Sequence, residues 1–316
     1  MSAAIAIGGT LGGCMTCMVV VESLAKSHTH AMNLMTFSNF LFISLQGLIF
    51  TSRFLSVPNK IPLRAYIPVV VTFCFVNIIN NLALSYRVPV PLHIIFRSGS
   101  LLSSLVMNRL LLGRQYTTKK YLSVVAITIG IIMCTLAEQG TQKSTSLSIE
   151  EAEKHLKDWS IGITMLTIAL IASSYLAICQ EKMYTTHGKH PDEAMFYVHA
   201  LSLPFFAFFG RDIVSCAQEF NQEPALELFG YNLVFSQAWW MVLATSIFQY
   251  FCIKFVYMAN AYMDSLSVTL LVTLRKFLSL LVSIIYFNNV FTATHWAGAI
   301  LVFGGTLVFS NVILRS

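Results

Sequence analysis

The chain has 316 residues, of which 56% are hydrophobic and 11% are charged, and its formal net charge is +6. Soluble domains carry about 25% charged residues, so this composition excludes a soluble globular protein and indicates a polytopic membrane protein. The connections between apolar runs are short, which leaves no extramembrane domain for catalysis, and we do not expect an enzyme.

Apolar runs of about 20 residues recur along the whole chain, and each is long enough to cross a hydrocarbon layer of about 30 Å. They lie at 3–25, 32–52, 65–85, 88–112, 117–137, 159–181, 192–215, 237–259, 263–287 and 292–313. We therefore predict an all-α fold of ten transmembrane helices. The first run lacks a basic leader, so it is interpreted as a span rather than a signal peptide.

The first span contains the pair Cys14-x-x-Cys17 among glycines. No second pair accompanies it, so the two cysteines are interpreted as small packing residues rather than as a redox or metal site. The other five cysteines also lie in or beside spans, and no disulfide framework is expected. They are Cys74, Cys134, Cys179, Cys216 and Cys252.

The third and fourth spans are polar on one side. The asparagines Asn77, Asn80 and Asn81 share a helix face in the third, where they are suited either to contact a substrate or to hydrogen-bond between helices. Pro89 and Gly99 flank Arg97 in the fourth span, so we expect the helix to bend there and to free amides for an anion.

Basic residues stand inside two spans, Arg97 in the fourth and the pair Arg275 and Lys276 in the ninth. Each costs roughly 2.5–3.5 kcal/mol at a helix centre, so they must face protein or a water-filled cavity. Polar residues at helical spacing accompany them, and the eighth span adds further candidates. These residues are His93, Ser100, Ser104 and Asn108 in the fourth span; Thr269, Thr273, Ser279 and Ser283 in the ninth; and Tyr250, Lys254 and Tyr257 in the eighth.

Two alternatives stay open for these cations. They are suited to bind an anionic ligand, or to pair with Glu22 or with helix carbonyls. Lys254 is also able to extend along its helix toward an interface.

Lys and Arg are more frequent in one set of connections than in the other, which predicts that both termini lie in the cytosol. The expected cytosolic set is Arg53, Lys60, Arg64, Arg114, Lys119, Lys120, Lys182, Lys189 and Arg315; the opposite set is Lys26, Arg87, Lys143, Lys154, Lys157 and Arg211. The two longest connections, 139–158 and 216–236, are expected on the non-cytosolic side with short interfacial helices.

A weak repeat relates the two halves. Residues 113–117 align with 288–292 at an offset of 175, which brings Tyr121 over Trp296 and Gly130 over Gly305. We predict a first five-helix repeat at 1–138, a connecting loop at 139–158 and a second, inverted repeat at 159–316. Small residues in helices five and ten allow close backbone approach, within the fold or at a homodimer contact. They are Gly130, Gly298, Gly304 and Gly305.

Three strings carry a family resemblance. They are NNLALSYRVPVPLHIIFRSGSL at 80–101, EAMFYVHALSLP at 193–204 and VTLLVTLRKFLSL at 268–280. They closely resemble the nucleotide-sugar transporters that carry UDP-N-acetylglucosamine and UDP-xylose, and the likeness spans nearly the whole chain.

The resemblance implies a drug/metabolite-transporter fold that exchanges a cytosolic UDP-sugar for lumenal UMP across the Golgi or endoplasmic reticulum membrane. It implies no cofactor and no nucleic-acid partner. Basic residues matching Arg97, Arg275 and Lys276 would hold the diphosphate. The family's Phe-Tyr-Asn-His motif reads Phe196-Tyr197-Val198-His199 here, which leaves Tyr197 and His199 as candidates for nucleotide recognition.

The candidate substrate-binding set is therefore Arg97, Arg275, Lys276, Tyr197, His199, Asn80, Asn81, Ser100, Thr273, Ser279, Lys254 and Tyr250. The alternative is a transporter of another nucleotide sugar or of a phosphorylated metabolite with the same fold.

Overall fold

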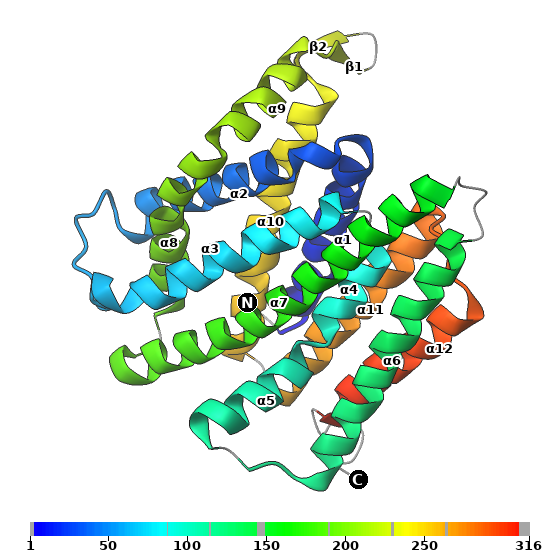
Figure 1. Cartoon of the computed structure of the whole chain (residues 1–316). Helices are drawn as coiled ribbons and strands as arrows, with labels where there is room; N and C mark the ends of the chain where they lie inside the picture. The colour runs from blue at the N-terminus through cyan, green and yellow to red at the C-terminus, as the bar shows by residue number, and fades with distance from the viewer. Residues whose placement is uncertain are drawn as a thin grey trace. The chain divides into compact units, whose positions relative to one another are not determined.

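A computed structural model of the chain describes residues 3–86, 88–113, 115–143, 149–188, 190–228, 231–262 and 265–309. The basic residues Arg87, Arg114, Lys189 and Arg315, which entered the predicted orientation, lie outside these ranges. The described chain is mostly helical (Figure 1). Its first half contains α1 (Ala3–Ser27), η1 (Thr29–Ala31), α2 (Met32–Gln46), η2 (Gly47–Thr51), α3 (Leu63–Ser85), α4 (Val90–Ser98), α5 (Ser100–Leu112) and α6 (Thr118–Lys143).

The second half is also mostly helical and contains one β-hairpin. It contains α7 (Ile149–His187), α8 (Pro191–Ser202), η3 (Leu203–Phe209), α9 (Gly210–Gln222), β1 (Ala225–Leu228), β2 (Tyr231–Ser236), α10 (Gln237–Tyr262), α11 (Ser265–Phe287) and α12 (Ala293–Phe309). Eight helical segments among the described residues are long and apolar enough to cross a membrane, and α12 is a shorter apolar helix. The chain is a polytopic membrane protein, as its composition predicts.

The helix predicted at 88–112 is broken where the sequence indicates. It ends as α4 at Ser98 and resumes as α5 at Ser100. A Cβ atom at Gly99 would lie 2.4 Å from Cδ1 of Ile131, so a larger residue would displace the end of that side chain where the break packs against α6. Arg97 therefore occupies the last turn of a short helix rather than the middle of a long one.

The predicted connections are more ordered than the hydropathy suggests. α6 continues to Lys143 and α7 begins at Ile149, so helix covers much of 139–158. The second connection, 216–236, contains the end of α9, as an interfacial helix there was expected, and also an antiparallel hairpin of β1 and β2, which was not predicted. Residues 231–236 include Tyr, Val and Phe, which are residue types enriched in strands.

The chain divides into two compact units, and each draws on both halves of the sequence. Unit 1 consists of 1–3, 82–175 and 259–316; unit 2 consists of 4–81 and 176–258. The unit boundaries fall inside α1, α3, α7 and α10.

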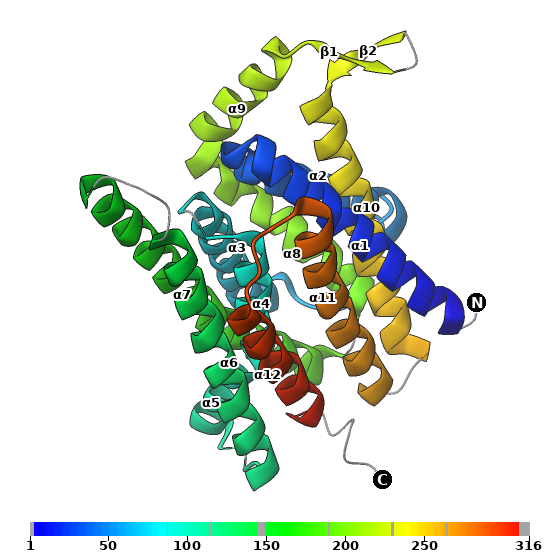
Figure 2. The same cartoon turned by 90° about the vertical axis from the view of Figure 1, so that its right-hand side faces the viewer.

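Within unit 1, α6 and α12 lie side by side (Figure 2). A Cβ atom at Gly130 would lie 2.5 Å from the carbonyl oxygen of Gly298, and one at Gly305 would lie 2.8 Å from the Ile127 side chain. The backbones approach closely because these positions are glycine. Gly304 differs, because its added Cβ would meet nothing within 4 Å. Three of the four small residues noted in the sequence thus pack inside the unit.

Within unit 2, a disulfide joins Cys14 of α1 to Cys252 of α10, with the two Cα atoms 4.7 Å apart. The expectation of packing cysteines without a disulfide is therefore wrong for this pair. The cysteines are 238 residues apart, and spacing alone cannot reveal a pairing of that separation. Cys17, by contrast, is a buried thiol whose Sγ lies 3.1 Å from Oε1 of Gln249.

We expect this disulfide to hold together a chain that has been cut between its two cysteines. A protease site inserted between Ser56 and Pro58, in the connection before α3, separates Cys14 from Cys252 once it is cleaved. The two fragments should migrate together on a denaturing gel without reductant and apart with reductant. Cys252→Ser should separate them under both conditions, whereas Cys216→Ser, which changes a free cysteine, should not. Fragments of the cut parent that separate without reductant would contradict the bond.

Candidate functional site

Arg97 is the most distinctive residue of unit 1. Every other residue from Pro91 to Gly99 is buried, whereas Arg97 is exposed. A long cation in a membrane-spanning segment costs several kcal/mol unless it reaches water or an anion. Arg97 is therefore the residue of this turn that the surrounding protein covers least.

Lys276 of α11 lies against the same turn. Its Nζ donates to the backbone carbonyl oxygen of Arg97 at 3.4 Å. The last carbonyls of a helix have no partner within it, so the ammonium satisfies an acceptor that the break at Gly99 leaves open. The positive charges of Arg97 and Arg275 both act on Lys276. The structure thus brings together all three predicted phosphate-binding cations.

The polar residues predicted beside these cations are also in unit 1. The carbonyl oxygen of Ser100, the first residue of α5, accepts a hydrogen bond from Oγ of Ser174 at 3.4 Å. Ser279 is buried on α11, one turn beyond Lys276. Thr273 belongs to α11, but its side chain lies outside the described part of the structure. The start of α5 adds the positive end of a helix dipole to this region.

Tyr197 of α8 lies in unit 2, at the wall of a cavity of about 230 Å³. The cavity opens between the connection 52–62 and the start of α8, and Lys60, His190 and Asp192 also line it. The Tyr197 hydroxyl donates to Oδ1 of Asn59, and its ring packs against Tyr66. Tyr197 therefore joins the connection 52–62 to α8.

Glu193 also joins the connection 52–62 to α8. Its carboxylate accepts hydrogen bonds from the backbone amides of Lys60 and Ile61 at 3.0–3.2 Å, and from the hydroxyl of Tyr66 at 3.2 Å. In the sequence, Glu193 was noted only as the first residue of the segment 193–204 that resembles the transporter family. Its role was missed because its donors are backbone groups more than 120 residues away.

His199 and Val198 are core residues. Nδ1 of His199 lies 2.7 Å from the Met195 carbonyl oxygen, and its ring packs edge-on against Phe40 and Phe73. Val198 belongs to a buried apolar cluster with Tyr66 and others. The valine that replaces the family asparagine thus completes an apolar contact in this chain.

The remaining candidates lie in unit 2. Asn81 donates to Oγ1 of Thr36 at 2.7 Å and to the Met32 carbonyl at 3.2 Å, which is the hydrogen bonding between helices that the sequence left open. Asn80 donates to the Val76 carbonyl in its own helix. The Lys254 ammonium lies 5.5 Å from the centroid of the Tyr250 ring, a cation–π contact.

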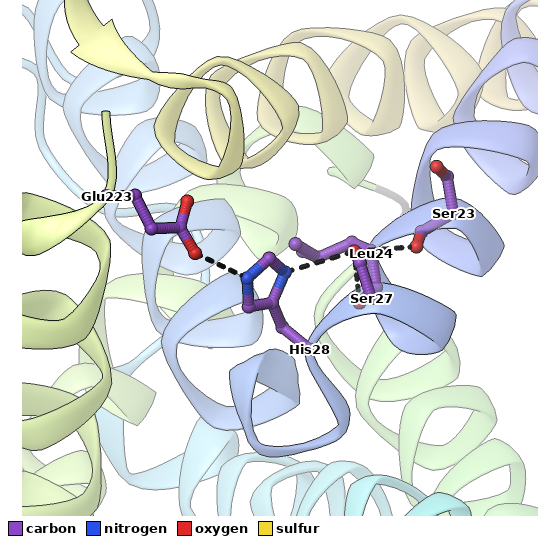
Figure 3. A network of polar contacts seen from close by, with 5 residues as sticks. All are labelled: Ser23, Leu24, Ser27, His28 and Glu223. Atoms are coloured by element: carbon purple, nitrogen blue, oxygen red, sulfur yellow. Dashed lines mark hydrogen bonds and ion pairs between the residues drawn. The ribbon is translucent and has the colours of Figure 1, made fainter. Parts of the chain in front are cut away.

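A polar network at the end of α1 was not predicted. Nε2 of His28 lies 2.6 Å from Oε1 of Glu223, and Nδ1 of His28 lies 3.0 Å from Oγ of Ser27 (Figure 3). Ser27 in turn donates to the carbonyl oxygen of Ser23 at 3.0 Å. The network ties the end of α1 to the end of α9. The two residues are 195 positions apart, so sequence spacing carries no signal for it.

Glu22, the acidic residue considered as an internal partner for the cations, has Oε1 3.9 Å from Nζ of Lys26, one turn away on α1. Among the described residues, no group of three or more His, Cys, Asp or Glu side chains is placed to hold a metal ion.

Comparison with known proteins gives consistent results. The sequence pattern of the UAA transporter family matches residues 2–313. The chain is 44% identical to the endoplasmic reticulum GDP-fucose transporter of Drosophila melanogaster, over 95% of this chain and 88% of that protein. It is 40% identical to the UDP-xylose and UDP-N-acetylglucosamine transporter of Danio rerio, over 95% of this chain and 91% of that protein. A crystal structure with 14% identity has a TM-score of 0.56 and covers 99% of this chain and 98% of its own, a likeness of fold alone.

Proposed function

The chain belongs to the UAA transporter family, and on this premise we propose that it is a nucleotide-sugar antiporter. Its substrates are UDP-N-acetylglucosamine and UDP-xylose, taken from the cytosol into the lumen of the Golgi or endoplasmic reticulum in exchange for UMP. The relatives named as nucleotide-sugar transporters support this class of substrate.

The observation that carries the proposal is the cationic group of unit 1. Lys276 lies at the Arg97 carbonyl, and the charges of Arg97 and Arg275 act on it. Three cations on apolar helices repel one another, and a pyrophosphate is a ligand that compensates their charge. Ser100, Ser279 and Thr273 add hydroxyls that suit phosphate oxygens.

The nucleotide and sugar would be recognised by the other candidates, Tyr197, His199, Asn80, Asn81, Tyr250 and Lys254. Tyr250 and Tyr197 offer aromatic rings, and the asparagines offer amides. His199 and Asn81 are already bonded within the protein. Their contribution to recognition would therefore be to hold neighbouring helices in place.

A fold of ten spanning helices in two inverted repeats of five suits this function. Each compact unit combines residues from both halves of the chain, which is compatible with equivalent parts of two repeats packing together. Both termini would lie in the cytosol. A homodimer through α6 and α12 would use their outer faces, since Gly130, Gly298 and Gly305 already pack within unit 1.

GDP-fucose is a second candidate substrate, and a specific observation favours it. The GDP-fucose transporter of Drosophila melanogaster is 44% identical to this chain, whereas the UDP-sugar transporter of Danio rerio is 40% identical. The two nucleotides share the pyrophosphate and differ in the base, so the cationic group alone does not separate them.

Thermal unfolding of the purified full chain with a ligand panel tests both candidates. A ligand that binds only the folded protein at about 100 times its Kd stabilises it by roughly 2.7 kcal/mol. UDP-N-acetylglucosamine, UDP-xylose and UMP should raise Tm, and CMP-sialic acid should not. A rise with GDP-fucose and GMP instead would select the second candidate, and no rise with any nucleotide sugar would reject the proposal.

A further inference from the structure

The corner between α5 and α6, in unit 1, presents three cations at the end of two membrane-spanning helices. We name Arg109, Lys119 and Lys120 the basic corner. α5 ends at Leu112 and α6 begins at Thr118, and both are parts of spans that are long and apolar enough to cross a bilayer. The basic corner must therefore lie at the level of lipid headgroups.

Aromatic rings hold two of these cations in place. The Arg109 guanidinium donates to the Tyr121 hydroxyl, and its Cζ lies 5.8 Å from the centroid of that ring. The Lys120 ammonium lies 5.5 Å from the Tyr116 ring centroid and 5.3 Å from that of Phe309. A guanidinium has five N–H donors, so Arg109 keeps donors for a further ligand. Cations held in this way lose little entropy when they bind an anion.

Lys119 stands at the head of a stripe of exposed apolar side chains on α6. The stripe follows helical spacing and consists of Leu122, Val125, Ile129, Ile132 and Leu136. Leu122 is 65% exposed, and Leu110 on α5 is 74% exposed. Large apolar side chains this exposed on a membrane helix face acyl chains. An acyl chain lying along this stripe would bring its headgroup to Lys119.

No Asp or Glu lies close to the basic corner in the sequence. No Asp or Glu occurs between Glu22 and Glu138, and 265–316 contains none. Glu138 is 19 residues beyond Lys119 on the same helix, which is about 28 Å at 1.5 Å per residue. This distance is several times the Debye length of about 8 Å at physiological salt. An external anion is the better partner.

We propose that the basic corner and the α6 stripe together bind one anionic phospholipid, with its phosphate at Lys119, an acyl chain along Leu122, Val125 and Ile129, and Arg109 adding positive charge at the same end of the two helices. The positive charge selects an anionic headgroup, and the apolar stripe selects a lipid rather than a soluble phosphate. Lys120, whose ammonium lies over the Tyr116 and Phe309 rings, adds a further positive charge. This site is separate from the cations of α4 and α11 and does not depend on the transported substrate.

Native mass spectrometry of the detergent-purified full chain tests the site with lipids of identical acyl chains. Phosphatidylinositol and phosphatidylserine should bind at least about tenfold more tightly than phosphatidylcholine. Because a Lys or Arg near a lipid headgroup contributes about a fivefold factor, Lys119→Gln should weaken binding about fivefold and the double variant with Arg109→Gln about 25-fold. Equal binding of phosphatidylcholine would overturn the proposal.

The matched control is the double variant Arg64→Gln with Lys182→Gln, which removes two exposed cations from unit 2. It should bind the anionic lipids as the parent does, and an equal loss there would show general electrostatic attraction and overturn the site. Lys119→Arg should restore binding, which separates lost charge from misfolding. Inositol phosphate that displaces the lipid at comparable concentration would also overturn the proposal, because it lacks acyl chains.

Discussion

Replacing Lys276 with alanine is expected to lower nucleotide-sugar uptake at least about 30-fold and to leave the empty protein no less stable to heat. Removing one partner of a desolvated charge pair costs about 2–5 kcal/mol of binding, which gives a loss of this size. The same substitution removes an ammonium on which Arg97 and Arg275 act with like charge, so the empty site loses repulsion. A residue with a purely structural role would lower uptake and stability together.

The measurement is uptake into proteoliposomes together with thermal unfolding, with and without substrate. Lys276→Ala should also lose the rise in Tm that substrate gives the parent. Lys276→Arg keeps the charge and should retain part of the uptake. Lys182→Ala, which removes an exposed lysine of α7, is the matched control and should transport as the parent does. Parental uptake by Lys276→Ala would remove the proposed phosphate contact.

Vesicles preloaded with UMP are expected to take up UDP-sugar at least about tenfold faster than empty vesicles. A site with three cations in apolar surroundings is costly without an anion, so the empty carrier should change conformation slowly. Either nucleotide compensates the charge and lowers that cost, which couples the two directions of transport without an added ion. Differential binding is the only means by which a ligand shifts such an equilibrium.

The control for exchange is preloading with uridine, which has the base and ribose but no phosphate. Uridine should not accelerate uptake if charge is the coupling agent. Uptake that is equal in empty and UMP-loaded vesicles would contradict exchange while leaving substrate binding in place. Preloading with GMP distinguishes the two candidate nucleotides in the same assay.

Hydropathy predicted the helices well because lipid requires every backbone group to be satisfied within its own segment. Residues such as Pro89 and Gly99 also marked the break between α4 and α5, since their effects on the backbone are local. The hairpin at 225–236 was missed because a short amphipathic segment at an interface satisfies its backbone as a helix or as a paired strand. Local pattern does not decide between these when the partner strand is unknown.

The candidate site was predictable to the extent that its chemistry is unusual for a membrane. Arg97 and Lys276 stand out because a cation in an apolar run is energetically costly. The structure brings the Lys276 ammonium into contact with the Arg97 carbonyl oxygen. Tyr197 and His199 were chosen by resemblance, and the structure places them in packed contacts whose partners are distant in sequence. Whether they also touch the nucleotide stays a prediction, which a Tyr197→Phe variant addresses through the KM for UDP-sugar.

The bond between Cys14 and Cys252 has a consequence for how the protein is made. The ribosome adds about 5–20 residues per second, so the 238 residues that separate the two cysteines take roughly 10–50 s to follow. During that interval the first helix is already in the bilayer, and the thiol of Cys14 is still reduced. It must not form a disulfide with another cysteine before α10 has been synthesised. The disulfide can therefore form only after the eighth predicted span has been synthesised. The time at which the protein matures then depends on when an oxidant reaches the two thiols.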